Sequence, residues 1–460
     1  MKITARLLGV VVLGVLTLAG CSKKSKPSSR SLEKTDSAAQ LKSFIAEKTA
    51  QADSVTNETP AEFKTFFQAA AKGDWLTVSN AFVDFRSHAG QYGHSEKTDE
   101  RLHGAAWQAV LETWGALDAF DSGGEKYSAA FGNDIISSIP DGSIYFGGTD
   151  PGRFLVTAMC KSQINGDPFF VLTQNALADG TYLEYLRGMF GGKIYTPTAE
   201  DAQKCFSDYC TDAQKRLQNH QLNPGEDVKV DDNGKVQVSG QIAVMGINGL
   251  LAKVVFDKNP DREFYIEESF PLDWMYPYLE PHSLIMKINR HPLAELSEKT
   301  VQADSDYWSK YITPMIGNWL NKETTVEDIA AFAEKVYGKQ DLGGFTGDPE
   351  FVQRKDAQRE FSKLRSSIAG LYAWRAQNAN DPSEKKRMTD AADFAYRQAW
   401  ALCPYSQEAV YRYINLLANA GRNDDALVIA QTAVKLSDDQ TSVAQLKETA
   451  KNLEQAMKAK

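Results

Sequence analysis

The chain has 460 residues, a formal net charge of −9 at pH 7, and 42% apolar and 24% charged residues. This length and apolar content suffice for a large core and two or three domains. Because the net charge is negative and no basic cluster follows the first 60 residues, the sequence indicates that nucleic acid is not a partner.

The amino-terminal residues have the pattern of an export signal. Lys2 and Arg6 supply positive charge, an apolar run follows, and the run ends in the tetrad LAGC at residues 18–21. The tetrad resembles the bacterial lipoprotein signal, which implies that residues 1–21 are a signal peptide and that Cys21 carries the lipid anchor. Ser22 favours the periplasmic face of the outer membrane as the location in the cell envelope. An uncleaved anchor or an ordinary export signal is the alternative.

The composition then divides the chain into regions. Residues 22–60 are rich in Lys, Ser, Glu and Thr, which predicts a flexible tether with a short isolated helix over 41–52. Helical periodicity on both sides of a Lys-Gly-Asp turn predicts a helical hairpin. The expected regions after the tether are the hairpin over 61–104, an α/β domain over 105–295, a helical connector over 296–346 and helical repeats over 347–460.

The stretch over residues 139–187 is the centre of the predicted fold. Residues 143–146 and 169–173 are short apolar runs bounded by turn residues, which predicts two buried parallel strands. Further strands are expected over 263–266 and 283–288. The fold class is therefore α/β, with a Rossmann-like, mostly parallel sheet flanked by helices. Asp-Asn-Gly between two alternating runs also predicts a β-hairpin over 228–240.

Polar residues follow both central strands. Thr149 and Asp150 can cap the helix after a Gly-rich turn, and Arg153 lies in its first turn. Ligands bind outside the carboxyl ends of strands in open α/β sheets. In the alternative, Asp150 only caps and Arg153 pairs with Asp179, with no ligand. The candidate ligand-binding residues are Thr149, Asp150, Arg153, Gln174, Asn175, Asp179 and Thr181.

No motif of known catalytic mechanics appears in the sequence. The six histidines form no H-E-x-x-H pair, no serine lies in G-x-S-x-G, and the G-x-x-x-x-G at residues 147–152 lacks the Lys-Ser/Thr of a phosphate loop. We therefore predict no catalytic residue, no metal site and no cofactor. Cys160, Cys205, Cys210 and Cys403 are expected to be buried thiols, and oxidation of one pair in the periplasm is the alternative.

The carboxyl-terminal region has the pattern of helical repeats. Gly421, Ala426 and Ala433 fit the turn and the small packing positions of a tetratricopeptide repeat. A polar loop is expected over 378–390, between helices at 360–377 and 389–402. We expect the aromatic residues of this region to dock on the α/β domain, and a peptide groove built from them is the alternative. These residues are Trp374, Tyr396, Tyr411 and Tyr413.

Two runs carry a family resemblance, GGTDPGRF at residues 147–154 and QNALADGTYLEYL at residues 174–186. With the order of elements over 105–295, they resemble the soluble C-terminal region of protein O-mannosyltransferase-like membrane proteins, a domain of unknown function. They are also similar to exported tetratricopeptide-repeat lipoproteins of unassigned activity. The membrane-spanning half of those enzymes has no counterpart here, so the resemblance implies the α/β fold and a saccharide- or peptide-facing role, without glycosyl transfer.

The leading interpretation is a lipid-anchored cell-envelope protein that serves as a non-catalytic scaffold for a protein or peptide partner. A glycan- or anion-binding module, or a divergent enzyme acting on glycans, would instead use the two strand-end loops. Both alternatives need Tyr145 and Val171 to pair in parallel, so that the loops open onto one hollow. If Phe154 or Tyr182 fills that hollow, the scaffold is favoured.

Overall fold

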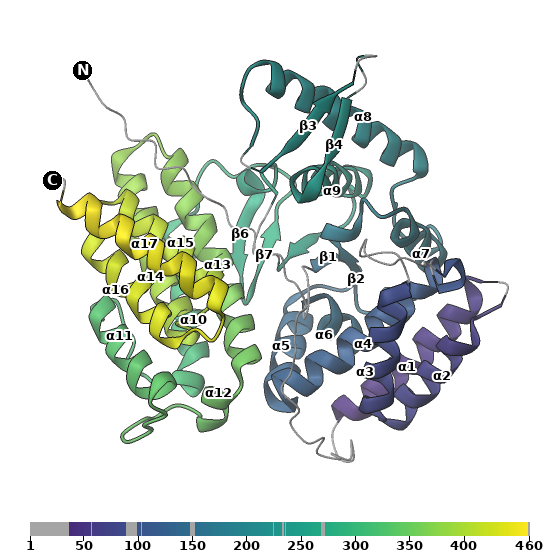
Figure 1. The fold of residues 1–460 in the computed structure, drawn as a ribbon, viewed down its shortest axis with the longest axis horizontal. Helices are drawn as coiled ribbons and strands as arrows, with labels where there is room; N and C mark the ends of the chain where they lie inside the picture. Colours follow the sequence, from purple (N-terminus) through teal and green to yellow (C-terminus); the bar gives the residue numbers. More distant parts are fainter. Residues whose placement is uncertain are drawn as a thin grey trace.

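Helices dominate this mixed α/β protein, which we describe from a computed structural model (Figure 1). The structure describes residues 36–56, 58–88, 99–102, 104–147, 152–223, 225–231, 234, 236–267 and 272–458. The predicted signal peptide with Cys21, and the turn with Thr149 and Asp150, lie outside these residues. The amino-terminal helices and the carboxyl-terminal helices lie on opposite sides of a small sheet.

The amino-terminal helices form one layer. In α1 the apolar residues Leu41, Phe44 and Ile45 recur at helical spacing and are buried, and α1 packs against α4 and α6. Residues 36–54 are therefore part of the folded body rather than an isolated helix in a flexible tether. The elements of this layer are α1 (Asp36–Ser54), α2 (Ala61–Lys72), α3 (Trp75–His88), the 3₁₀ turn η1 (Glu100–Leu102), α4 (Ala105–Gly123) and α5 (Glu125–Ser138).

The central sheet has five strands in the order β2-β1-β5-β7-β6. Tyr145 of β1 lies opposite Val171 of β2 in a parallel pair, which confirms the prediction for these two strands. β5 is parallel to β1, whereas β7 is antiparallel to both β5 and β6, so the sheet is mixed rather than mostly parallel. The strands are β1 (Ile144–Gly147), β2 (Phe170–Thr173), β5 (Phe264–Ile266), β6 (Leu279–His282) and β7 (Ile285–Ile288).

The antiparallel part of the sheet arises from a hairpin that the sequence pattern did not predict. Pro281 interrupts β6, and Ser283 turns the chain at a positive φ of 54° into β7. An interior proline is unusual in a strand, and it is tolerated here because β6 lies at the edge of the sheet. The short run that carries β6 therefore lacks the signature of a strand.

Helices and a second hairpin surround the parallel strands. The predicted hairpin forms, with Val228 opposite Val238, and it packs with α8 and α9 around a small separate core at Tyr209, Ala213 and Ala243. These elements are α6 (Gly152–Met159), η2 (Gln174–Ala176), α7 (Gly180–Phe190), α8 (Ala199–Gln218), β3 (Asp227–Val230), β4 (Val236–Ser239), α9 (Gly240–Lys258) and η3 (Tyr276–Tyr278).

Within the described ranges, α9 is the one helix that is long and apolar enough to cross a membrane, a property it shares with core helices of soluble proteins. Asn248 in the middle of α9 is fully buried. Its side chain accepts a hydrogen bond from the Ala178 amide at 2.6 Å and donates one to the Asn175 carbonyl at 2.9 Å. These bonds hold α9 against the loop that follows β2.

The carboxyl-terminal region is entirely helical. α14 begins at Pro382, within the segment predicted as a polar loop, because Asp381 caps it by accepting from the Glu384 amide. Trp374 stacks on Tyr276 of the α/β domain at 5.3 Å, as expected, whereas Tyr396 and Tyr413 stack on each other at 5.7 Å. Its elements are α10 (Glu298–Ile316), α11 (Val326–Ala333), the π-helical turn η4 (Glu334–Gly338), α12 (Pro349–Gln353), α13 (Lys355–Asn378), α14 (Pro382–Leu402), α15 (Gln407–Asn419), α16 (Asn423–Leu436) and α17 (Gln440–Lys458).

One hydrophobic core runs through all three layers. Its buried residues extend from Leu41 in α1 through Phe146 in the sheet to Leu453 in α17. Apart from the small core around Tyr209, the described parts of the predicted regions therefore share one core.

Candidate functional site

The strand-end edge of the sheet brings the two predicted loops together. Because β1 and β2 are parallel, Arg153 in the first turn of α6 and Gln174 directly after β2 come to the same edge. Both side chains lie inside the protein, with Arg153 6% exposed and Gln174 fully buried. The two loops therefore meet as predicted, but Arg153 and Gln174 are buried in the interior of the protein.

Tyr182 fills the hollow at this edge. Its hydroxyl accepts a hydrogen bond from the Thr173 amide at 2.7 Å, and its ring lies 5.3 Å from the Arg153 guanidinium. Phe154 is also buried and lies 5.1 Å from the same guanidinium.

Two cavities occur elsewhere in the described part of the chain, one of about 500 Å³ between the β6–β7 turn and α10, and one of about 370 Å³ between α7 and α8. Neither is lined by a predicted ligand-binding residue.

The remaining predicted residues of the second loop have structural contacts. Asp179 caps α7, where its Oδ1 accepts from the Thr181 amide and from the Thr181 hydroxyl, both at 2.8 Å. The Asn175 carbonyl accepts from Asn248 on α9. These contacts account for the shape of the loop without a ligand.

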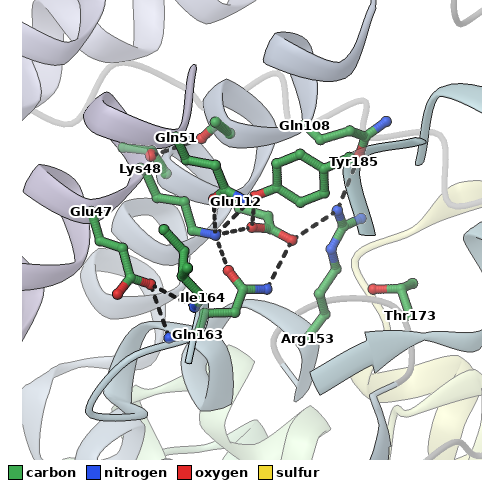
Figure 2. Close-up of polar contacts among 12 residues, drawn as sticks. Glu47, Lys48, Gln51, Gln108, Glu112, Arg153, Gln163, Ile164, Thr173 and Tyr185 are labelled. Atoms are coloured by element: carbon green, nitrogen blue, oxygen red, sulfur yellow. Dashed lines mark hydrogen bonds and ion pairs between the residues drawn. The ribbon is translucent and has the colours of Figure 1, made fainter. Parts of the chain in front are cut away.

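Arg153 belongs to a group of buried polar side chains that we call the Lys48 cluster (Figure 2). Lys48 Nζ lies 2.6 Å from Glu112 Oε2 and donates to the Tyr185 hydroxyl at 2.8 Å and to Gln163 Oε1. Arg153 reaches the second carboxylate oxygen, Glu112 Oε1, at 3.4 Å. The cluster comprises Lys48, Gln51, Gln108, Glu112, Arg153, Gln163 and Tyr185.

Five segments supply the Lys48 cluster, and they are α1, α4, α6 with Arg153, the loop after α6, and α7. α1 places Phe44, Lys48 and Gln51 on one face, since these positions are four and three residues apart. Glu112 lies in the middle of α4, and Tyr185 lies in α7. Gln163 lies in the loop after α6, which Glu47 of α1 holds by accepting from the Gln163 amide at 2.9 Å and the Ile164 amide at 3.2 Å. The cluster thus joins α1 to the α/β domain.

Burial and the charged side chains of the cluster shift the pKa values of Glu112, Lys48 and Tyr185. Burial opposes ionisation of Glu112, but Lys48 and Arg153 outweigh it and hold the pKa of this carboxyl below its usual value. Burial lowers the pKa of Lys48, against the attraction of Glu112. Burial and the nearby Glu112 raise the pKa of Tyr185 well above its usual value. The Tyr185 phenol therefore stays protonated and donates to Glu112 Oε2 at 2.7 Å.

Sequence reasoning identified only Arg153 of this cluster. A lysine on the apolar face of the 41–52 helix, and a glutamate inside the apolar helix around residues 105–120, were the available signals. A charged residue on a face that must be buried needs a partner of opposite charge. Gln163 and Tyr185 carried no comparable signal.

Two polar side chains at the strand ends have no hydrogen-bond partner in the described part of the chain. They are the amide of Gln174, at both its oxygen and its nitrogen, and the hydroxyl of Thr173. Both residues are buried. A buried polar atom without a partner costs about 1–3 kcal/mol, so this edge has unused hydrogen-bonding capacity.

The four described cysteines are free thiols. Cys160, Cys205 and Cys403 are buried, and Cys210 is half-buried. Burial raises the pKa of Cys403 to about 12, so its thiolate is scarce at neutral pH. Among the described residues, no three histidine, cysteine, aspartate or glutamate side chains come together in a way that could hold a metal ion.

Comparison of the chain with protein-family models, curated proteins and solved structures gave no match.

Proposed function

We propose that this chain is a lipoprotein of the bacterial cell envelope that binds a protein or peptide partner and performs no chemistry on it. The LAGC tetrad supports an anchor at Cys21, on the periplasmic face of the outer membrane. The scaffold role rests on one observation, which is that Tyr182 and Arg153 fill the hollow at the strand ends. A ligand-binding domain of this class would keep that hollow open.

The groove between α7 and α8 is the surface that suits a partner best. Phe206 on α8 lines this groove and is 43% exposed, so its ring offers apolar surface to a partner. Arg187 is exposed at the same groove and donates to the Pro197 carbonyl at 2.7 Å. An apolar side chain with a nearby carboxylate fits this combination. The groove is lined by Gly180, Leu183, Arg187, Ala199, Ala202, Gln203 and Phe206.

Site-specific photo-crosslinking in envelope preparations tests this proposal. A photoreactive phenylalanine at position 206 should capture one protein, whereas the same group at Val83, an exposed apolar position on α3, should not. Phe206→Ala should then weaken binding of that protein about thirtyfold, because truncating an anchoring aromatic side chain costs about 2 kcal/mol. Equal capture at both positions, or capture at neither, would contradict the proposal.

We also propose a finer description of the fold and an explanation of the family resemblance. The β1–α6–β2 unit, with its parallel strands joined through a helix, supports a Rossmann-like half-sheet. The antiparallel helices from α13 to α17 support a tetratricopeptide-like array. We propose on this basis that the resemblance to exported tetratricopeptide-repeat lipoproteins reflects common architecture.

The unpartnered amide of Gln174 favours a second candidate function, a glycan- or anion-binding module. Displacement of Tyr182 would bring a ligand hydroxyl or phosphate oxygen to Gln174 and Thr173, which could then satisfy their hydrogen bonds. Titration calorimetry with inorganic phosphate and soluble glycans tests this candidate. Heat of binding that persists in Gln218→Leu, an exposed control, and disappears in Gln174→Leu would support it; no heat with the unaltered protein would exclude it.

A further inference from the structure

Three side chains of the Lys48 cluster place an amine, a carboxylate and a side-chain amide in mutual contact. Lys48 is 0%, Glu112 1% and Gln163 2% exposed. Lys48 Nζ donates to Gln163 Oε1, so the amine lies against the side-chain amide. Glu112 contacts both groups, with Oε2 2.6 Å from Lys48 Nζ and Oε1 3.4 Å from Gln163 Nε2 (Figure 2). One carboxylate therefore bridges an amine and the amide nitrogen beside it.

These are the parts required for transamidation. The electron pair of Lys48 Nζ, once freed of a proton by Glu112, can attack Gln163 Cδ, and the bond from Cδ to Nε2 then breaks. Glu112 returns this proton to the departing nitrogen, as a general base that becomes a general acid, and then passes the second proton of the former amine nitrogen to the released ammonia. The lysine ammonium and the glutamine amide thus give a secondary amide and one ammonium ion, with no oxidant, reductant or energy source consumed.

The surroundings of the three groups favour this reaction. Tyr185 hydrogen-bonds to both Lys48 Nζ and Glu112, and the Gln51 side chain accepts from Nζ at 3.1 Å, so the amine has little freedom. Holding reactants in contact replaces an encounter in solution by an intramolecular step. Burial also lowers the pKa of Lys48, which favours the neutral, nucleophilic amine. Exclusion of water protects the product from hydrolysis.

We propose that Lys48 and Gln163 form an intramolecular isopeptide bond, with Glu112 as the proton-transferring catalytic residue. The bond joins α1 to the loop after α6 and closes a segment of 115 residues between its ends. α1 is the first helix in the described part of the chain, and the expected lipid anchor at Cys21 precedes it in the sequence. A pull on the anchor would then reach the α/β domain through a covalent bond. This proposal does not depend on the partner-binding role.

Peptide mapping of the full-length chain by mass spectrometry tests the proposal. Trypsin cannot cleave after a modified Lys48, so the unaltered protein should yield residues 43–64 joined to residues 162–187, one ammonia lighter than the two peptides together. Lys48→Arg keeps the positive charge and Glu112→Gln keeps the shape of the side chain, and both should yield the two regions as separate peptides. Separate peptides in full amount from the unaltered protein would overturn the proposal.

The chain also contains a matched control. Lys193 Nζ donates to Asn165 Oδ1 at 3.2 Å, but Lys193 and Asn165 are exposed, and no carboxylate bridges them in the described contacts. Trypsin should cleave after Lys193 as usual. A branched peptide at Lys193, or one that persists at Lys48 in Glu112→Gln, would show that proximity alone suffices and would remove the role assigned to Glu112.

Discussion

Two clusters built on a buried ion pair lie on opposite sides of the sheet, and the cation of each cluster decides its chemistry. The Lys48 cluster joins α1 to the α/β domain. Its counterpart, which we call the Arg365 cluster, joins α10, α13 and α14, with Arg365 2.7 Å from Asp304 and 2.8 Å from the Gln398 side-chain oxygen. Tyr372 donates to the same aspartate at 2.8 Å, as Tyr185 does to Glu112. Both clusters therefore combine a cation, a carboxylate, a glutamine and a tyrosine.

The comparison separates electrostatic pairing from reactivity. Arg365 and Gln398 are as deeply buried as Lys48 and Gln163. The guanidinium of arginine stays protonated in proteins and offers no free electron pair, whereas a buried lysine can lose its proton. The Arg365 cluster is therefore restricted to hydrogen bonds and an ion pair. The Lys48 cluster can instead exchange its lysine–carboxylate ion pair for a covalent bond, because Lys48 loses its charge in the amide.

The largest expected effect comes from removal of the carboxylate in each cluster. Glu112→Gln leaves Lys48 and Arg153, and Asp304→Asn leaves Arg365, without the carboxylate that pairs with them, and loss of one such buried pair costs about 3–5 kcal/mol. Glu112→Gln should also prevent the cross-link, and a bond that closes 115 residues adds about 4–5 kcal/mol. Urea unfolding of both variants should thus show a clearly larger loss for Glu112→Gln. An equal or smaller loss of unfolding free energy in Glu112→Gln would contradict a covalent bond in the Lys48 cluster.

A smaller effect is expected in the pH dependence of stability. The pKa of Glu112 in the folded protein lies below its ordinary value of 4.5. The stabilising contribution of this carboxylate is therefore present above pH 4.5 and is lost as the pH falls through the lower, folded-state pKa. In urea unfolding series from pH 7 downward, the stability difference between the unaltered protein and Glu112→Gln should shrink below pH 4.5. A difference that stays constant would contradict the assigned ionisation of Glu112.

The parts of the fold that follow local patterns could be predicted from the sequence. The strands around Tyr145 and Val171 are apolar runs bounded by turn residues, and the hairpin at Val228 has an Asp-Asn-Gly turn, so both were found. β6 was missed because it contains Pro281, and α14 was predicted to begin too late because Pro382 at a first helical position looks like a loop residue.

The Lys48 cluster could not be predicted in the same way, because no local sequence pattern shows which distant residues come together. Arg153 was recognised because it begins a helix after a glycine-rich turn. Lys48, Glu112 and Gln163 lie far apart in the sequence, and only the packing of α1 against α4 and α6 brings them together. A short helix over 41–52 was predicted, but the polar composition around residues 22–60 concealed its packing against the folded body, since the apolar face of α1 is narrow and contains the charged Lys48.

The most direct test of the account is the mass of the full-length chain, purified with its anchor and measured under denaturing conditions beside Lys48→Arg. We predict that the unaltered protein is one ammonia lighter than its sequence and anchor require, and that Lys48→Arg has its full mass. An unaltered protein at full mass would show that Lys48, Glu112 and Gln163 form only an ion pair with hydrogen bonds, as the Arg365 cluster does.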